Sequence, residues 1–303
     1  MTAAAFDLVL RADANPTVGA GHAMRLAALG AAWLAAGGRA RVAGDLDLGF
    51  VTARYREIGI PITDEPARAG EVVVVDSYDP GIRFRVAQLP GPALRVMVDD
   101  LGGEVPSGYD VVWNPSPFGR PELYQSYLGR VLGGIDRLAI REDLSPWDRG
   151  SNEVIVSLGG SEPDRQIKEA FEQLARLAPE VPFAMAGSWG PTGWRRVAPE
   201  HFWRETARAR AMITGAGGTV WEAAVVGIPV VLLEIAPNQR LIYRWARDAG
   251  VPGLKTSLVD ADFLAHQLRA LLPAARPLPR VQSGTRLVAA ELAQLAADRQ
   301  AAR

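Results

Sequence analysis

Short runs of β-branched apolar residues alternate with helix-length segments along the whole chain, and this alternation restricts the fold more than any other feature. It is the pattern of parallel sheets that are covered by helices on both faces. The predicted strands are 8–11, 40–43, 72–76, 94–98 and 111–113, then 154–157, 183–186, 211–214 and 230–233. The predicted helices are 20–36, 50–58, 80–89, 165–177, 219–226, 239–248, 262–272 and 285–297.

A polar segment at 141–152 separates two halves that both show this alternation, and Pro146 and Gly150 within it disfavour regular structure. We therefore predict an α/β protein with two Rossmann-like, doubly wound domains at 1–145 and 150–303, the second of which includes the last helix. Sheets of this kind bind ligands at the carboxyl ends of their strands. The cleft between the two domains is the expected site.

The composition restricts the partners that the chain can have. Hydrophobic residues make up 48% of the sequence and charged residues 22%, which is the range of globular proteins. A formal net charge of −1 provides no overall field that would attract nucleic acid or an anionic membrane. The chain has no cysteine, which excludes disulfides, thiolate zinc sites and a cysteine nucleophile, and fits a reducing compartment.

The apolar segments do not predict membrane insertion. The longest of them, 220–236, is interrupted by Glu222, Gly227 and Glu234, so it does not read as a membrane span. Residues 1–13 have no basic region and therefore do not resemble a signal peptide. We expect a cytoplasmic protein with no nucleic-acid partner, and a monomer.

A glycine-containing turn between the first strand and the first helix contains the most reactive candidate, His22. Gly19 and Gly21 precede it, and glycines at such a turn allow a ligand to approach the backbone at a helix N-terminus. A dinucleotide fingerprint would need a third glycine where the chain has Met24, which disfavours a nicotinamide cofactor. His22 is either a surface or capping residue or a general base, and a helix N-terminus favours its neutral, proton-accepting form. We favour the general base.

Two similar turns follow strands of the second half. The first contains Gly160 and Ser161, and the second contains Gly217, Gly218 and Thr219. Their backbone N–H groups are suited to hold a pyrophosphate at a helix N-terminus. Neither turn has the G-K-[ST] sequence of a P-loop, so ATP hydrolysis is not expected. Glu222, one turn into the following helix, would either accept from ribose hydroxyls or complement the helix dipole.

Other motifs are weaker. The acidic pairs Asp45/Asp47 and Asp99/Asp100 permit a magnesium site but do not require one, since aspartate is common after strands and no histidine accompanies them. No G-x-S-x-G elbow is present, so a serine hydrolase lacks its nucleophile. Trp189 and Trp194 are able either to stack on a nucleobase or to pack in the core.

Taken together, these segments resemble the UDP-2,4-diacetamido-2,4,6-trideoxy-sugar hydrolases of pseudaminic acid biosynthesis and the related spore-coat polysaccharide proteins. The signature R-x-D followed by G-x-G-H-x-x-R matches Arg11, Asp13, Gly19, Gly21, His22 and Arg25. Further matches follow in order: 75–78 (V-D-S-Y), 98–101 (V-D-D-L), 157–160 (S-L-G-G), 215–222 (G-A-G-G-T-V-W-E) and 238–239 (N-Q).

The resemblance implies a glycosyltransferase-B fold in which His22 activates water against the anomeric carbon of a UDP-sugar, without a metal or other cofactor. The sugar side would be formed by Arg11, Asp13, Gly19, Gly21, Arg25 and Tyr78. The nucleotide side would be formed by Gly160, Ser161, Gly217, Gly218, Thr219, Glu222, Asn238 and Gln239.

Three hypotheses about function remain open on the sequence. The first is a hydrolase that releases UDP and free sugar with inversion at the anomeric carbon. The second is a glycosyltransferase on the same scaffold, in which His22 deprotonates an acceptor hydroxyl. The third is a protein that binds a nucleotide sugar without turning it over.

Overall fold

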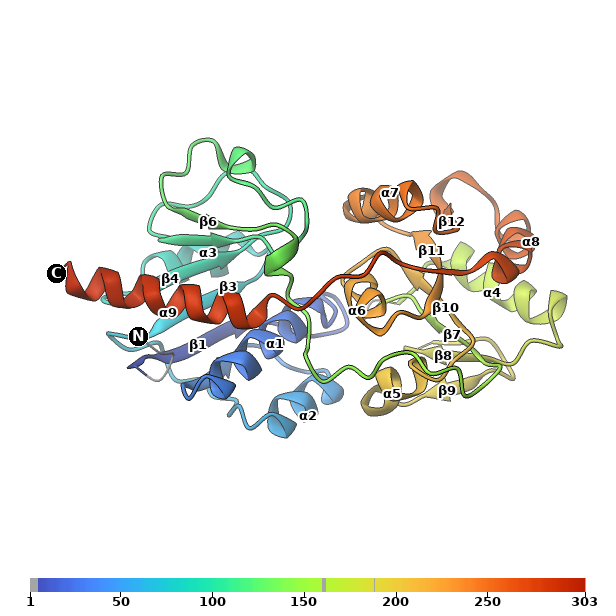
Figure 1. Ribbon diagram of the computed structural model, residues 1–303, viewed down its shortest axis with the longest axis horizontal. Helices are drawn as coiled ribbons and strands as arrows, with labels where there is room; N and C mark the ends of the chain where they lie inside the picture. Colours follow the sequence, from blue (N-terminus) through green and yellow to red (C-terminus); the bar gives the residue numbers. More distant parts are fainter. Residues whose placement is uncertain (1–4, 160–161, 188, 303) are drawn as a thin grey trace. The chain divides into compact units, whose positions relative to one another are not determined.

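The chain forms two compact units, shown as ribbons in Figure 1. The computed structural model describes residues 5–159, 162–187 and 189–302. One unit, called unit 1 below, contains Met1–Glu142 together with Gln282–Arg303, and unit 2 is Asp143–Val281. Each unit has its own sheet, and every strand pair is parallel except the short β11–β13 pair. This confirms the prediction of an α/β protein with two Rossmann-like, doubly wound domains.

The sheet of unit 1 has the strand order β2-β1-β3-β4-β5-β6. Its strands are β1 (Asp7–Ala12), β2 (Arg39–Ala43), β3 (Val72–Asp76), β4 (Leu94–Val98), β5 (Val111–Trp113) and β6 (Arg130–Leu132). Its helices are α1 (Gly21–Ala35), α2 (Gly49–Glu57), α3 (Pro80–Ala87) and α9 (Thr285–Ala301). The strand order reverses between β1 and β3, so the carboxyl ends of these two strands lie at the point where such sheets bind ligands.

The two faces of this sheet are covered unequally. Alternate side chains of the central strands, such as Leu8 and Leu10, pack into one core with α1, α2 and α9. Side chains of the opposite parity, such as Val9 and Val75, pack with α3 in a separate core. Because successive residues of a strand point to opposite faces, the parity of a strand residue determines which helices its side chain meets.

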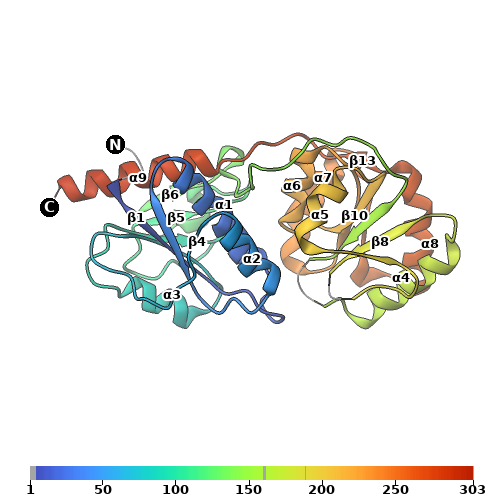
Figure 2. The same ribbon diagram turned by 90° about the horizontal axis from the view of Figure 1, so that it is seen from below.

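The last helix, α9, belongs to unit 1, and the prediction that it forms part of the second domain is wrong. Figures 1 and 2 show α9 lying beside α1, and Val288, Leu292 and Ala296 are fully buried in the core that the two helices share. Arg137 also pairs with Glu291 at 2.6 Å. The apolar stripe of α9 therefore finds its partner in unit 1, although the preceding 139 residues, Asp143–Val281, form unit 2.

The sheet of unit 2 has the order β12-β11-β10-β7-β8-β9, and β13 pairs with β11. Its strands are β7 (Val154–Ser157), β8 (Phe183–Ala186), β9 (Arg195–Val197), β10 (Ala211–Gly215), β11 (Pro229–Glu234), β12 (Gly253–Lys255) and β13 (Arg276–Pro277). Its helices are α4 (Arg165–Leu177), α5 (Phe202–Thr206), α6 (Thr219–Val226), α7 (Arg240–Asp248) and α8 (Ala261–Leu271). Figure 2 shows α4 and α8 side by side, and both contribute to the core on one face of the sheet. The strand order reverses at β7, which has β8 and β10 as neighbours.

The polar segment predicted as a linker is attached to unit 2. Backbone N–H groups of Trp147, Asp148 and Gly150 donate to carbonyls of that unit at 2.8 to 2.9 Å. The chain thus passes from unit 1 to unit 2 at Glu142 and Asp143. No helix in the described part of the chain is both long enough and apolar enough to span a membrane.

Candidate functional site

A tight turn joins β1 to α1 at the reversal point of the first sheet. The carbonyl of Asn15 accepts a hydrogen bond from the N–H of Gly19 at 2.8 Å, and the side-chain oxygen of Asn15 accepts from Thr17 and Val18. Gly19 has a φ of 80°, a left-handed conformation that strongly favours glycine. The turn thereby starts α1 at Gly21 and places His22 in its first turn, where no side chain caps the helix.

His22 is paired with Asp76, the last residue of β3. Its Nδ1 lies 2.5 Å from Oδ1 of Asp76, and the two residues are 8% and 1% exposed. The Asp76 oxygen, which only accepts hydrogen bonds, lies closer to Nδ1 than the donor Nη2 of Arg25 does, at 2.5 against 3.1 Å, so we assign the proton to Nδ1 and the acceptor lone pair to Nε2. Within the residues that the structure describes, Nε2 has no hydrogen-bond partner. It is not among the fully buried atoms without a partner, so part of its surface is accessible. The arrangement leaves Nε2 of His22 as the ring nitrogen that a ligand can reach.

Arg25, one helical turn after His22, binds two carboxylates. Its Nε and Nη2 donate to the two oxygens of Asp76, each at 2.9 Å, and its Nη1 donates to Asp100 at 2.5 Å. Burial by itself would lower the pKa of Arg25, but Asp76 and Asp100 outweigh it and raise that pKa well above its ordinary value. Arg25 is thus a permanent cation inside the cluster.

Tyr78 and Asp100 complete the cluster. The hydroxyl of Tyr78 donates to Oδ1 of Asp100, and its ring meets the ring of His22 edge-on at a centroid distance of 4.7 Å. Burial and the nearby carboxylate of Asp100 raise the pKa of Tyr78, so the phenol stays a donor. Burial would raise the pKa of Asp100, but Arg25 and the Tyr78 hydroxyl more than offset it and lower that pKa.

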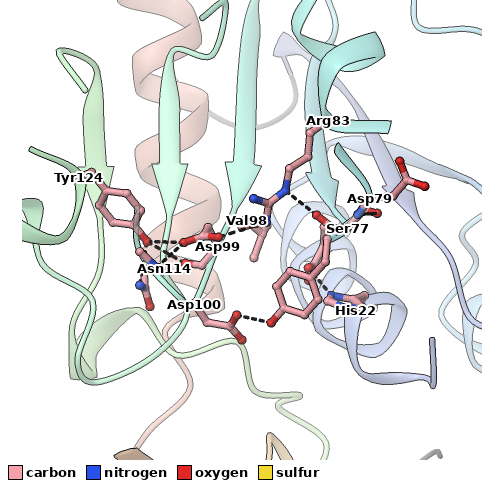
Figure 3. A network of polar contacts seen from close by, with 12 residues as sticks. His22, Ser77, Asp79, Arg83, Val98, Asp99, Asp100, Asn114 and Tyr124 are labelled. Carbon is pink, nitrogen blue, oxygen red and sulfur yellow. Dashed lines mark hydrogen bonds and ion pairs between the residues drawn. The ribbon is translucent and has the colours of Figure 1, made fainter. Parts of the chain in front are cut away.

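The neighbouring carboxylate, Asp99, has hydrogen-bond donors of its own, and Figure 3 draws it together with His22 and Asp100. It accepts hydrogen bonds from Arg83 at 3.1 Å, from the N–H of Gly102 at 2.7 Å and from the hydroxyl of Tyr124 at 3.0 Å. Both members of the Asp99/Asp100 pair are therefore engaged by arginine and hydroxyl donors. Among the described residues, no group of three or more histidine or acidic side chains has a metal-binding arrangement.

Two residues assigned to the sugar side, Arg11 and Asp13, are not in the His22 cluster. Arg11 pairs with Asp13 at 2.5 Å, and Asp13 also accepts the N–H of Asp45 at 2.8 Å. Arg11 has the parity of Val9, so its side chain lies on the α3 face of the sheet. There it lines a cavity of about 190 Å³ together with residues of α3. Asp76 has the opposite parity and faces α1. The structure therefore separates Arg11 from His22 by the thickness of the sheet.

The second glycine turn of unit 2 follows β10, next to the reversal point of that sheet. A Cβ built on Gly217 would have only Nε2 of Gln239 nearby, at 3.8 Å, and one built on Gly218 would meet nothing within 4 Å. No side chain caps α6. The N–H groups of Gly217, Gly218 and Thr219 have no acceptor among the described residues and lie beside this open space, whereas those of Val220 and Trp221 donate to the carbonyls of Gly217 and Gly218. Gly160 and Ser161, assigned to the turn after β7, lie outside the described residues.

Gln239 holds this turn in place. Its Oε1 accepts hydrogen bonds from the N–H of Ala216 at 3.2 Å and from the N–H of Ile235 at 3.1 Å, so it ties the turn after β10 to the end of β11. Asn238 beside it is exposed, whereas Glu222 and Thr219 are half-buried. The nucleotide-side residues that the structure describes thus gather around one loop, with Gln239 as its support.

The two tryptophans that were candidates for base stacking differ in their surroundings. Trp194 stacks on Phe183 at 4.5 Å and meets Phe171 edge-on, so it packs against the core. Trp189 is half-buried beside α4, with Nζ of Lys168 5.9 Å from the centre of its ring.

Sequence reasoning missed the partner of the histidine. Asp76 appeared only as part of a family match, and Asp100 as part of another match and as a possible metal ligand, yet these two carboxylates contact the histidine and the arginine. The available signal was position: both lie at the carboxyl ends of apolar strands, and strand order brings the end of β3 next to β1 and the end of β4 next to β3. That order is not readable from local sequence.

No protein-family model matches the chain, and no curated protein matches its sequence. Several solved structures do share its fold. UDP-GlcNAc 2-epimerase from Neisseria meningitidis, bound to UDP-GlcNAc, is 11% identical, with a TM-score of 0.63 over 95% of this chain and 100% of the other. The calicheamicin glycosyltransferase CalG4 is 14% identical, with a TM-score of 0.53 over 97% and 95%.

A third structure, the glycosyltransferase SnogD from Streptomyces nogalater, is 19% identical, with a TM-score of 0.53 over 97% of this chain and 95% of the other. At such low identity, these likenesses show the fold alone. They confirm the glycosyltransferase-B architecture that was predicted from the sequence resemblance.

Proposed function

We propose that the chain is a nucleotide-sugar enzyme in which His22 acts as the general base for attack of an oxygen nucleophile on the anomeric carbon. The observation that carries this proposal is the His22–Asp76 pair at the ligand-binding edge of the first sheet. Asp76 takes the Nδ1 proton at 2.5 Å, which leaves Nε2 as a proton acceptor without a protein partner among the described residues. A buried, oriented imidazole of this kind is poorly explained as a helix cap.

The pair would perform the proton transfer in the following way. Nε2 of His22 takes the proton of the nucleophile as its oxygen bonds to C1, and the C1–O bond to the diphosphate breaks with its electron pair leaving on the diphosphate oxygen. The imidazolium that forms is stabilised by the Asp76 carboxylate at Nδ1. A single attack from the side opposite the leaving group inverts the anomeric configuration.

We place the diphosphate on the glycine turn of unit 2. Gly217, Gly218 and Thr219 offer backbone N–H groups beside open space at the start of α6, and such donors stabilise a departing diphosphate without a metal ion. Glu222 and Asn238 stand near the same turn, and we assign them to the nucleoside. UDP is the proposed nucleotide, supported by the sequence resemblance and by similar folds solved with UDP or UDP-GlcNAc.

The nucleophile distinguishes two reactions. Most of the fold relatives named above or found with them are called glycosyltransferases, and this favours an acceptor hydroxyl over water. We therefore propose glycosyl transfer as the leading reaction. The second candidate is hydrolysis, carried by the signature from Arg11 to Arg25, which resembles UDP-sugar hydrolases.

The base assignment is tested with His22→Ala. We expect turnover of the UDP-sugar to fall by about 100- to 10,000-fold, the usual contribution of a general base, while the affinity for UDP stays unchanged because the nucleotide is assigned to unit 2. UDP release gives the rate and calorimetry the affinity. If the variant kept more than about a tenth of the wild-type rate, His22 would not be the general base and its role would be structural.

The nucleophile is identified by incubating the wild-type protein with a panel of UDP-sugars, first without an acceptor and then with sugar and lipid-linked hydroxyl acceptors. If the reaction is glycosyl transfer, UDP is released only when an acceptor is present, and the product is a glycoside with inverted anomeric configuration. Steady acceptor-free release with ¹⁸O from labelled water at the sugar C1 would instead establish the hydrolase. If the bound UDP-sugar stays intact both with and without an acceptor, the chain is a protein that binds a nucleotide sugar without turning it over.

A further inference from the structure

Arg25 joins two carboxylates beside His22, and all three of its guanidinium nitrogens are used. Nε and Nη2 hold both oxygens of Asp76, and Nη1 holds Asp100. Its side chain is 19% exposed, and that of Asp76 is 1% exposed. We had expected Arg25 to bind the sugar substrate. A guanidinium that is already bound to two carboxylates has no free fork for a substrate anion.

We propose that Arg25 is a positioning residue, which clamps Asp76 and Asp100 so that His22 carries a single proton, on Nδ1, and presents Nε2 as the base. This inference rests on the proposed role of His22. Arg25 acts through Asp76 and does not touch the reacting atoms.

The geometry supports a clamp. Asp76 ends β3, and Asp100 lies two residues beyond the end of the adjacent β4. Arg25 bridges them from α1, so one planar side chain connects three elements at the sheet edge. The other carboxylate oxygen of Asp100 accepts a hydrogen bond from the hydroxyl of Tyr78. A lysine could supply the same charge but not three donors at fixed angles.

The charges around His22 explain why a clamp is needed. The groups that face His22 are Asp76, Arg25 and Tyr78, and Asp100 lies behind them. An uncompensated carboxylate at 2.5 Å would favour the doubly protonated imidazolium, which cannot accept a proton. Nη2 of Arg25 and Nδ1 of His22 share Oδ1 of Asp76 and lie 3.1 Å apart. The arginine therefore places a positive charge beside Asp76, which opposes a second proton on the ring, and the same arginine also pairs with Asp100.

The clamp is tested by ¹⁵N NMR of the full chain with labelled histidine, which reports the protonation of each ring nitrogen without any substrate. The chain has three histidines, so the spectrum is simple, and His22→Ala identifies the signals of His22. In the wild-type protein at neutral pH we expect Nδ1 protonated and Nε2 unprotonated. In Arg25→Gln we expect both nitrogens protonated at the same pH, because the cation is lost.

Arg25→Lys separates the effect of the positive charge from that of the guanidinium geometry. It also provides a test of the clamp if Arg25→Gln fails to fold. We expect a singly protonated ring that exchanges between the two tautomers, since the charge remains but Asp76 is held at one point only. The turnover number of this variant should fall by about 100-fold with KM for the nucleotide sugar nearly unchanged, as expected for a misplaced base.

Arg83→Gln is the matched control. Arg83 is also mostly buried, pairs with the neighbouring Asp99 at 3.1 Å and lies at the same sheet edge, but it contacts neither His22 nor Asp76. This variant should keep the wild-type tautomer of His22. The wild-type pattern in either Arg25 variant would overturn the clamp. Unchanged turnover in His22→Ala would overturn the proposed function instead, and would leave the NMR result standing.

Discussion

At the scale of single residues, the site is a chain of oppositely charged groups in which each carboxylate has a defined role. Asp76 orients His22, Asp100 anchors Arg25, and Asp99 fastens the loops that follow β4 and β5. Each side chain is buried or half-buried, so their interactions are screened less than those of surface pairs. The cluster therefore contributes to stability as well as to the proposed chemistry.

Asp100 makes this contribution depend on pH. Burial opposes its charged form, but Arg25 and Tyr78 prevail, so the pKa of Asp100 in the folded protein is below its ordinary value. A carboxyl group with a lowered folded-state pKa stabilises the protein above its unfolded-state pKa, and this stabilisation is lost as pH falls through the folded-state value.

We predict that Asp100→Asn lowers the free energy of unfolding at neutral pH and that the difference from the wild type shrinks as pH falls below about 4. Urea unfolding from about pH 7 to about pH 2 measures both curves. Asp64→Asn, at an exposed aspartate with no partner among the described residues, should follow the wild type throughout. Parallel curves for Asp100→Asn and the wild type would contradict the assigned ion pair.

At the scale of elements, the turn between β10 and α6 is built to leave space. Gln239 fixes its backbone from the side, and the first N–H groups of α6 border a region that no described side chain fills near Gly218. Neither Gly217 nor Gly218 has a positive φ, so conformational freedom does not explain the two glycines. The absence of a side chain does, if a ligand approaches the backbone there.

We predict that Gly217→Ala and Gly218→Ala fold normally but bind UDP about 10-fold or more weakly, a loss of about 1.4 kcal/mol, because the new methyl group occupies the proposed phosphate position. Calorimetry with UDP measures the affinity, and thermal unfolding checks the fold. Gly49→Ala, at the start of α2 and also with nothing within 4 Å of its Cβ, is the control and should bind UDP normally. Wild-type affinity in both variants would place the diphosphate elsewhere.

At the scale of the whole molecule, unit 1 is completed by the end of the chain. The core between α1, α2, α9 and the sheet contains Val288, Leu292, Ala293, Ala296 and Ala297. Unit 1 therefore cannot form its complete core until the last helix has been synthesised, although its sheet is encoded by the first 132 residues.

Leu292→Ala tests this dependence. Leu292 is fully buried and Leu287, on the same helix, is 42% exposed. We predict that Leu292→Ala costs about 2–5 kcal/mol of stability in unit 1, while Leu287→Ala costs much less, because only the first leaves a cavity. Hydrogen exchange resolved by peptide should show the loss in residues of α1 and β1 and not in unit 2. Equal losses in both units would mean that they unfold together.

Local pattern was sufficient for most of the elements. Five strands of unit 1 and four of unit 2 were predicted within about two residues of their observed bounds, since most of their residues are apolar and buried. Four strands were missed: β6, β9 and β12, which have three residues each and lie at sheet ends, and the two-residue β13 beside β11. Each has at most one buried side chain. No local apolar signal marks them.

The sequence by itself determined the fold class and the positions of the glycine turns after β1 and β10, and it singled out His22 as a candidate, because periodicity and turn chemistry act over a few neighbouring residues. Only the tertiary structure decided which groups meet. Asp76 is 54 residues from His22, and Asp100 is 75 residues from Arg25. Their contact depends on the order of β1, β3 and β4 in the sheet. The same reason explains two further outcomes. Strand parity places Arg11 on the face of the sheet opposite to His22, and the apolar face of α9 is buried against unit 1. Both depend on the assembled sheet, and no short segment contains that information.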